Sequence, residues 1–214
     1  MTTPRAPGAT LVPFDAELRA LVRMAAVIAA GSEREMRLAV AEGARAVRPV
    51  WGEEVVLQSY LFAGFPRALN AAREWRRLVP NTPPADEGSE IERVGEWAAR
   101  GEVTCAAVYD GMYEKLRANV RALHPALDSW MVVEGYGKVL SRPGLDLVRR
   151  ELCILSACAA ARQDRQLLSH LHGARNVGAP NELVDATLDA LDGAIGADAL
   201  DDARRLWARV KGGD

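Results

Sequence analysis

The sequence predicts an all-α protein, and three observations lead to this fold class. Alanine, leucine, arginine and glutamate are abundant among the 214 residues, whereas aromatic residues make up only 6%. Apolar residues recur at helical spacing, and β-branched alternation of the kind that marks strands is nearly absent. Capping residues, glycines and prolines separate these periodic segments at intervals that suit helices.

The first half of the chain is expected to form four helices, over residues 15–31, 32–47, about 53–63 and about 66–78. Asp15 offers an N-cap oxygen to the first helix, and Ser32 with Glu35 forms a capping box for the second. Gly64 is expected to end the third helix. Pro66 suits the first turn of the fourth, where its missing N–H is harmless.

A proline-rich segment, Pro80–Ala85, divides the chain. Its three prolines, at 80, 83 and 84, can neither continue a helix nor enter a sheet. We therefore expect a domain linker here, between one domain over residues 14–80 and another over residues 86–214.

The second half is expected to hold further helices, over residues 89–101, 103–123, 125–136, 146–161 and 163–176, then two helices through Leu191 and Trp207. Gly101 is taken as a helix end, and Pro125 as the first residue of a helix. The residues from Ser141 to Gly144 favour a turn.

Composition and charge exclude several classes of function. A net charge of −2 gives no electrostatic footprint for nucleic acid, and no stretch approaches the ~18 apolar residues that span a bilayer. The three cysteines are odd in number, form no CxxC and lie in apolar runs, so neither a disulfide framework nor a zinc site is expected. We expect a cytoplasmic protein with no metal, no cofactor, no nucleic acid partner and no membrane partner.

One helical unit is expected to occur twice. Leu21, Met24, Ile28 and Met36 each lie 131 residues before a leucine or alanine in the second half (152 − 21, for example). Such agreement between two amphipathic helices also arises by chance, so periodicity alone leaves the repeat open.

His170 is the histidine best placed for chemistry. It lies three residues after Leu167 and four before Ala174, so it follows the edge of an apolar helical stripe. Glu151, on the preceding helix, would meet it if the two helices form an antiparallel hairpin. A carboxylate that orients an imidazole is an arrangement suited to general acid–base catalysis, because imidazole exchanges protons near neutral pH.

Two other interpretations of these residues stay open. His170 is also consistent with a core-edge histidine that only satisfies a hydrogen bond, and Glu151 with a partner of Arg149, Arg150 or Arg165. His172 points away from the apolar stripe and His124 precedes a proline at a helix junction, so both are expected at the surface or in a cap.

A family resemblance rests on Arg150-Glu151-Leu152, on the run from Gln163 to Ala174 and on Asn176, Gly178 and Glu182. These residues resemble the carboxymuconolactone decarboxylase and AhpD-like alkylhydroperoxidase superfamily. The run from Tyr136 to Asp146 looks like the family segment that enters its core helical hairpin. The run from Tyr60 to Asn70 looks like the family's Gly-x-Pro helix junction. The resemblance implies two tandem AhpD-like units, each built around a helical hairpin.

The family has a peroxidase branch and a decarboxylase branch, and the resemblance implies a different activity for this chain in each case. The two peroxidase cysteines align with Gln163 and Gln166, while the histidine and glutamate of that branch align with His170 and Glu151. Glutamine has no redox chemistry, so thiol peroxidase activity is not expected. The decarboxylase branch needs no cysteine. Its histidine aligns with His170 and its acidic residues with Asp164 and Gln166, so the resemblance implies substrate-binding roles for Gln163, Asp164 and Gln166.

The first unit lacks the acid–base residues, because Ala20 and Ala39 stand 131 residues before Glu151 and His170. We expect it to be structural and to supply, within one chain, the neighbour that single-domain relatives obtain by self-association. Family members assemble as trimers or hexamers, so the resemblance implies a homo-oligomer of two-domain chains, a dimer or a trimer.

The sequence leaves three candidate functions for this protein. The first is a cofactor-free lyase or decarboxylase that acts on a small lactone or carboxylate, with His170 and Glu151 as catalytic residues. The second is a non-catalytic family member that serves as a scaffold or binds a small-molecule ligand. The third is a thiol-based redox protein that uses Cys153 or Cys158.

Overall fold

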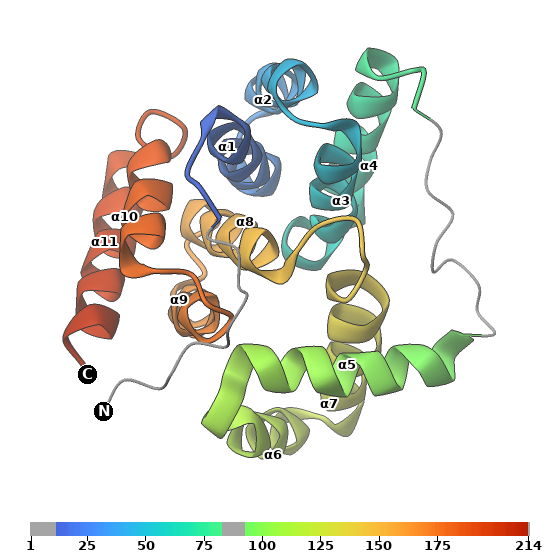
Figure 1. Ribbon diagram of the computed structural model, residues 1–214, viewed down its shortest axis with the longest axis vertical. Coiled ribbons are helices and arrows are strands. Elements are labelled where there is room, and N and C mark those ends of the chain that lie inside the picture. Colours follow the sequence, from blue (N-terminus) through green and yellow to red (C-terminus); the bar gives the residue numbers. More distant parts are fainter. Residues whose placement is uncertain (1–11, 83–92, 214) are drawn as a thin grey trace.

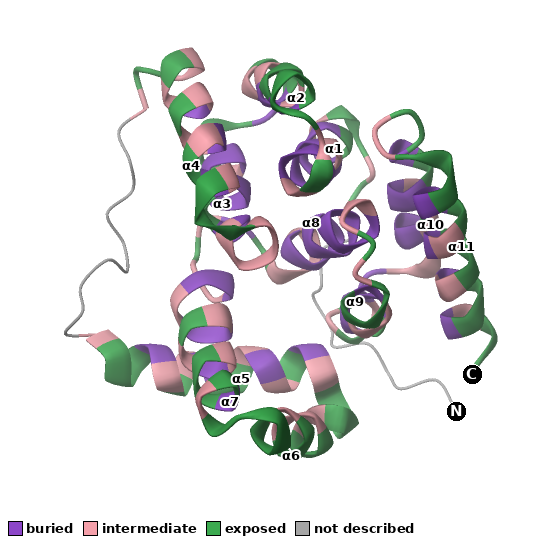
Figure 2. Ribbon diagram, turned by 180° about the vertical axis from the view of Figure 1, so that it is seen from behind, coloured by how far each residue is buried: buried purple, intermediate pink, exposed green. Residues whose placement is uncertain are grey.

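A computed structural model describes residues 12–82 and 93–213, and the regular elements in those ranges are all helical. The expected all-α class is therefore confirmed. Helix α8 (Leu147–Ala160) lies at the centre, with α1 (Ala16–Ala30) on one side and α9 (Asp164–Asn176) on another (Figure 1). The ten residues from Arg150 to Ala159 are all buried, which makes α8 the axis of the core (Figure 2).

The caps at the start of the chain form as expected. The Leu18 amide donates to Asp15 Oδ1 over 2.8 Å at the start of α1. Helix α2 (Glu33–Ala46) begins with the capping box, in which the Ser32 amide donates to Glu35 and the Glu35 amide donates to Ser32. These reciprocal bonds satisfy N–H groups that have no partner within the helix.

The third helix differs from its expected bounds. Helix α3 (Pro49–Gln58) begins at Pro49, whose fixed φ suits the first helical position, and ends before Ser59. Helix α4 (Tyr60–Leu78) follows at once and bends at Gly64, where φ is +78°. The backbone is non-helical at Gly64, so the helix break expected there and the new start at Pro66 are both present within α4. The difference is that the residues just before Gly64 belong to α4 and not to α3.

The middle of the chain folds into α5 (Val94–Tyr109), a short 3₁₀ turn η2 (Asp110–Met112), α6 (Tyr113–Leu123), α7 (Pro125–Trp130) and the π-helix η3 (Met131–Leu140). Two expectations fail here. Helix α5 continues through Gly101, so this glycine does not end a helix. A side chain at this position would overlap the Val132 carbonyl of η3, so the glycine allows α5 and η3 to pack closely. The helix expected over 103–123 breaks at Asp110, whose φ is +46°.

The last part of the chain matches its expected order. Asp146 caps α8 by accepting from the Arg149 amide, and the residues before it form the expected turn. After α9, Gly178 adopts φ +101° and the chain continues into α10 (Asn181–Ala190) and α11 (Ala197–Gly212). Helices α10 and α11 lie together at one side of the molecule (Figure 1).

One hydrophobic core joins the two halves of the sequence. Helix α1 packs against α8, and buried residues of both belong to a single apolar cluster. A buried polar network adds to this contact: the Arg150 guanidinium donates to Glu54 over 2.8 Å and to Gln58 over 3.1 Å, both on α3. Residues 83–85 of the expected linker, and the start of the helix expected over 89–101, lie outside the described residues.

Candidate active site

The centre of the candidate site is a buried pair, Glu151 on α8 and His170 on α9. The short connection after α8 lets these two helices pack side by side. His170 Nδ1 and Glu151 Oε2 are 2.8 Å apart, and the side chains are 7% and 0% exposed. Glu151 thus faces the imidazole and not one of the neighbouring arginines.

The surroundings of Glu151 leave room for the carboxylate and little else. A methyl group on Gly173 would lie 2.7 Å from Glu151 Oε2 and from Val108, so only glycine fits beside the pair. The second oxygen, Oε1, is buried and has no hydrogen-bond partner among the described residues. A buried acceptor without a partner costs free energy of folding. Such groups are rare in folded proteins, and a role in function is one explanation for them.

Two tyrosines complete the buried surroundings of Glu151. The Tyr109 and Tyr136 rings meet edge to face, with centroids 6.1 Å apart. Burial raises the pKa of Tyr109 to about 12, and the nearby Glu151 charge acts in the same direction. Burial also raises the pKa of Tyr136 well above its ordinary value. Both hydroxyls therefore stay protonated near neutral pH, as neutral hydrogen-bonding groups.

An open cleft of about 460 Å³ lies beside His170. Its walls come from α4, α7, η3 and α9, and its lining residues are Tyr60, Leu61, Phe62, Leu127, Trp130, Met131, Glu134, Gly135, Tyr136, Leu140 and His170. Because Nδ1 of His170 faces Glu151, Nε2 is the ring nitrogen left for a ligand in this cleft. A mostly apolar cleft with a few polar groups is the usual form of a small-molecule site.

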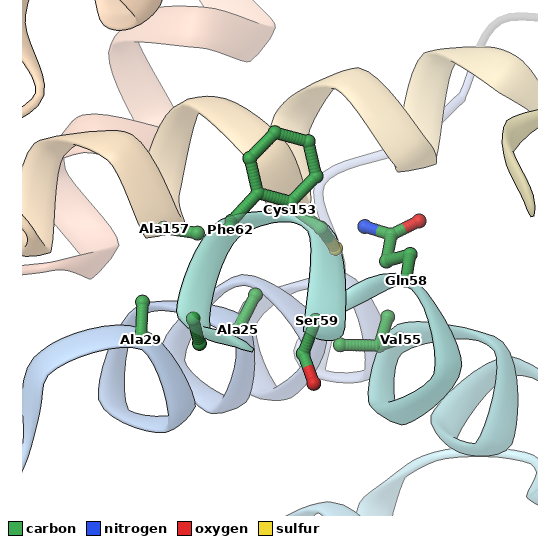
Figure 3. Close-up of a pocket in the computed structure, with 9 residues that line it drawn as sticks. Ala25, Ala29, Val55, Gln58, Ser59, Phe62, Cys153 and Ala157 are labelled. Carbon is green, nitrogen blue, oxygen red and sulfur yellow. The ribbon is translucent and has the colours of Figure 1, made fainter. Parts of the chain in front are cut away.

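Phe62 of α4 fixes the position of the imidazole from the N-terminal half. Its ring meets His170 edge to face, with centroids 5.8 Å apart and planes at 84°. Behind Phe62 there is only a small cavity of about 10 Å³, which Cys153 and Ala157 of α8 also line (Figure 3). The packing behind the ring is therefore tight, with space for about one water molecule.

The residues expected to bind substrate lie elsewhere. Asp164 and Gln166 are exposed at the start of α9, and Gln163 is half-buried just before it. Gln163 accepts a weak hydrogen bond from Cys158 Sγ at 3.9 Å. None of the three is among the residues that line the cleft beside His170. Their substrate-binding role stays a prediction.

The other histidines lie where the sequence predicted. His124 is exposed and caps α7, because its Nδ1 accepts from the Ala126 amide over 3.0 Å. His172 is exposed on α9. Neither contributes to the cleft beside His170.

The thiols are poorly placed for redox chemistry. Cys105, Cys153 and Cys158 are all buried, and burial raises the pKa of each to about 12. A protonated thiol is a poor nucleophile. Within residues 12–82 and 93–213, no group of three metal-ligating side chains comes together, and no helix is long and apolar enough to cross a membrane.

Sequence reasoning missed most of the cleft wall. Tyr60 and Phe62 were noted only as part of a helix junction, and Glu134 and Trp130 were not singled out. All four line the cleft, together with Tyr136. No spacing in the sequence connects α4 with α9, so no local signal was available for this contact.

Comparison with known proteins relates the helices that carry this site to one family. Residues 129–209 match the model of the carboxymuconolactone decarboxylase family. The chain is also 26% identical over 132 residues to Peroxisomal protein 2 of Schizosaccharomyces pombe. That match covers 61% of this chain and 62% of the relative, so it spans less than two thirds of the relative's length.

An all-helical core that buries one carboxylate against one imidazole is thus combined with a family match over the same helices. The resemblance is confirmed as a match: residues 129–209 fit the model of the carboxymuconolactone decarboxylase family, and they include both Glu151 and His170.

Proposed function

We propose that this protein is a cofactor-free acid–base enzyme that acts on a small lactone or carboxylate in the cleft beside His170. The observation that carries the proposal is the buried 2.8 Å contact between His170 Nδ1 and Glu151, which leaves Nε2 for the cleft. A carboxylate that accepts from Nδ1 fixes the tautomer and the ring orientation. His170 is the catalytic residue in this scheme, and Glu151 positions it.

The chemistry of a lyase fits this arrangement. In a decarboxylation, the bond between the carboxylate carbon and its neighbour breaks and carbon dioxide leaves. The electron pair passes into a conjugated carbonyl as an enolate. Protonated His170 then donates its Nε2 proton to carbon, and no cofactor is required. On a lactone without a carboxylate, neutral His170 removes a proton beside the carbonyl and returns it at another carbon.

A comparison of two histidine variants tests the role of His170. The purified protein is incubated in D₂O with a panel of lactones, unsaturated carboxylates and hydroperoxides, and NMR follows turnover and deuterium incorporation. His170→Ala is expected to lose at least ~100-fold in rate, as is usual when a general acid or base is removed. His172→Ala, an exposed residue two positions further on, is the matched control and should retain the parental rate.

An unchanged rate in His170→Ala would refute the proposal. The second candidate function is a non-catalytic ligand binder. Stable complexes in native mass spectrometry, with no change in the mass of any ligand, would support it. The replacement of both family cysteines by Gln163 and Gln166 favours that alternative, because it shows that one family chemistry has been lost.

We also propose that the chain is a fused pair of related units. Helices α1 and α8 begin 131 residues apart (147 − 16), and so do α2 and α9 (164 − 33). Contact between α1 and α8 supports an internal pair, in which the first unit shelters the site of the second. The proposed assembly is a dimer or trimer of such chains, which light scattering measures directly.

For location, we propose the cytoplasm, because three cysteines without disulfides suit a reducing compartment. The name of the S. pombe relative associates that protein with peroxisomes. Imaging of a fluorescent fusion with markers for both compartments distinguishes the two.

A further inference from the structure

The residues that line the cleft beside His170 differ greatly in their exposure. Tyr136 and Leu140 are each 4% exposed and the His170 side chain is 7% exposed, so these residues form the inner end of the cleft. Leu127 and Trp130 line the same cleft, yet they are 47% and 60% exposed. The cleft therefore has an inner end that holds the imidazole and an outer end whose apolar walls face solvent.

Phe65 adds a third exposed apolar side chain next to this cleft. Phe65 is 62% exposed, and its ring stacks on Tyr60, a lining residue, with centroids 4.8 Å apart. Single exposed apolar residues are common on protein surfaces. Here Phe65, Leu127 and Trp130 adjoin one hollow, and exposed apolar residues that gather in this way mark a binding surface.

Glu134 does not change the apolar character of the cleft. It is the one carboxylate among the described residues that line the cleft, and its side chain is 53% exposed. Its Oε1 is 4.0 Å from Lys138 Nζ, so the carboxylate stays both hydrated and paired, and we assign it no charge preference. Apart from His170, the rest of the lining consists of aromatic side chains, leucine, methionine and glycine.

The volume of the cleft exceeds that of a simple lactone ring. A five-membered lactone has six non-hydrogen atoms, which fill about 180 Å³ if each takes the ~30 Å³ of a water molecule in the liquid. The cleft has about 460 Å³, so the ring alone would fill less than half of it. The remaining space suits roughly nine more non-hydrogen atoms at the same volume per atom.

We propose that the cleft takes a lactone with an apolar side chain of about four to eight carbons. The ring lies at the inner end beside His170, and the chain lies along Leu127 and Trp130 toward solvent. A fully buried methylene strengthens binding about 4-fold, so about 2-fold per carbon is expected on walls that are half exposed. This inference rests on the proposed function in taking the His170 cleft as the site of a lactone.

The test uses γ-hexalactone and γ-decalactone, which share one ring and differ by four chain carbons. Ligand-observed NMR titration at pH 7 measures the two dissociation constants. The decalactone is expected to bind the parent protein at least ~10-fold tighter than the hexalactone. A smaller ratio, or no binding of the decalactone up to about 1 mM, would overturn the inference.

Variants test whether the chain lies on the outer walls. Leu127→Gln and Trp130→Gln should each reduce the ratio to below ~5-fold, because the chain then meets a polar amide. Leu38→Gln is the matched control for Leu127→Gln, at a position of α2 that is 62% exposed, and it should keep the parental ratio. A parental ratio in either cleft variant would show that the chain binds elsewhere and would contradict the inference.

A second copy of this chain is the alternative cover for the same exposed side chains. Light scattering compares the molar mass of the parent protein with that of Leu127→Gln. The inference expects the same molar mass for both. A lower molar mass for the variant would identify an interface between copies and would overturn the inference.

These measurements fail independently of the proposed function, because they report binding and require no turnover. A ratio below ~10-fold, together with a rate that depends on His170, would reject this inference alone. A ratio of ~10-fold or more, together with a rate that does not depend on His170, would reject the acid–base proposal alone.

Discussion

Replacement of Arg150 by methionine tests how the two halves of the chain are held together. Arg150 is completely buried on α8, and its guanidinium makes four hydrogen bonds. Two of the acceptors are side chains of α3, Glu54 and Gln58, and two are the carbonyls of Arg142 and Leu145. Methionine keeps an unbranched apolar side chain and has no hydrogen-bonding N–H groups, so the substitution removes the four bonds together with the guanidinium.

The expected loss of stability is large. Removal of one partner from a buried ion pair costs about 3–5 kcal/mol, because the other charge stays buried without compensation. Arg142 still lies 3.0 Å from Glu54, which keeps the carboxylate partly paired. We therefore expect the lower end of this range, about 3 kcal/mol, which is a substantial fraction of the ~5–15 kcal/mol typical of native proteins.

Urea unfolding followed by circular dichroism measures this difference. Arg165→Met, at an exposed position on α9, is the control and should change the free energy of unfolding by no more than ~0.5 kcal/mol. The cost of Arg150→Met should fall by at least ~1 kcal/mol in a Glu54→Gln background, since the two side chains interact directly. A loss below ~1 kcal/mol in Arg150→Met would refute the reasoning.

Two further predictions concern titratable groups. Burial raises the pKa of the three thiols to about 12, so they should react with iodoacetamide at pH 7 at least ~100-fold more slowly in the native protein than in urea. Intact-protein mass spectrometry follows the labelling. Fast labelling of the native protein would contradict this and support a thiol-based redox protein. The pKa of Asp128 is lowered by hydrogen bonds from Arg117 and Arg121. Its stabilisation is therefore present above the unfolded value near ~4 and is lost as the pH falls through the folded value. Asp128→Asn should cost about 2–3 kcal/mol in urea unfolding at pH 7 and clearly less at pH 3; equal costs at both would contradict this assignment.

The sequence predicted those parts of the fold that depend on local chemistry. Asp15, Ser32 and Asp146 cap helices because their oxygens reach amides within the next turn. The contact between Glu151 and His170 was also predictable, since two adjacent helices with a short connection must pack together.

Features that depend on distant contacts were beyond the sequence. Gly101 looks like a helix end, and only the position of η3 shows that it allows two helices to approach. Asp110 gives no sign of its positive φ. The cleft wall depends on Tyr60 and Phe62, which lie more than a hundred residues from His170 along the chain.

The origin of that wall bears on how the protein can be dissected. A fragment limited to residues 129–209 would contain both members of the buried pair, yet it would lack the α4 side chains that shield the imidazole from solvent. Water would then reach the imidazole from the side that the Phe62 ring covers. Recombinant work that trims this chain to the segment that matches the family model would therefore remove the part of the cleft wall that α4 supplies.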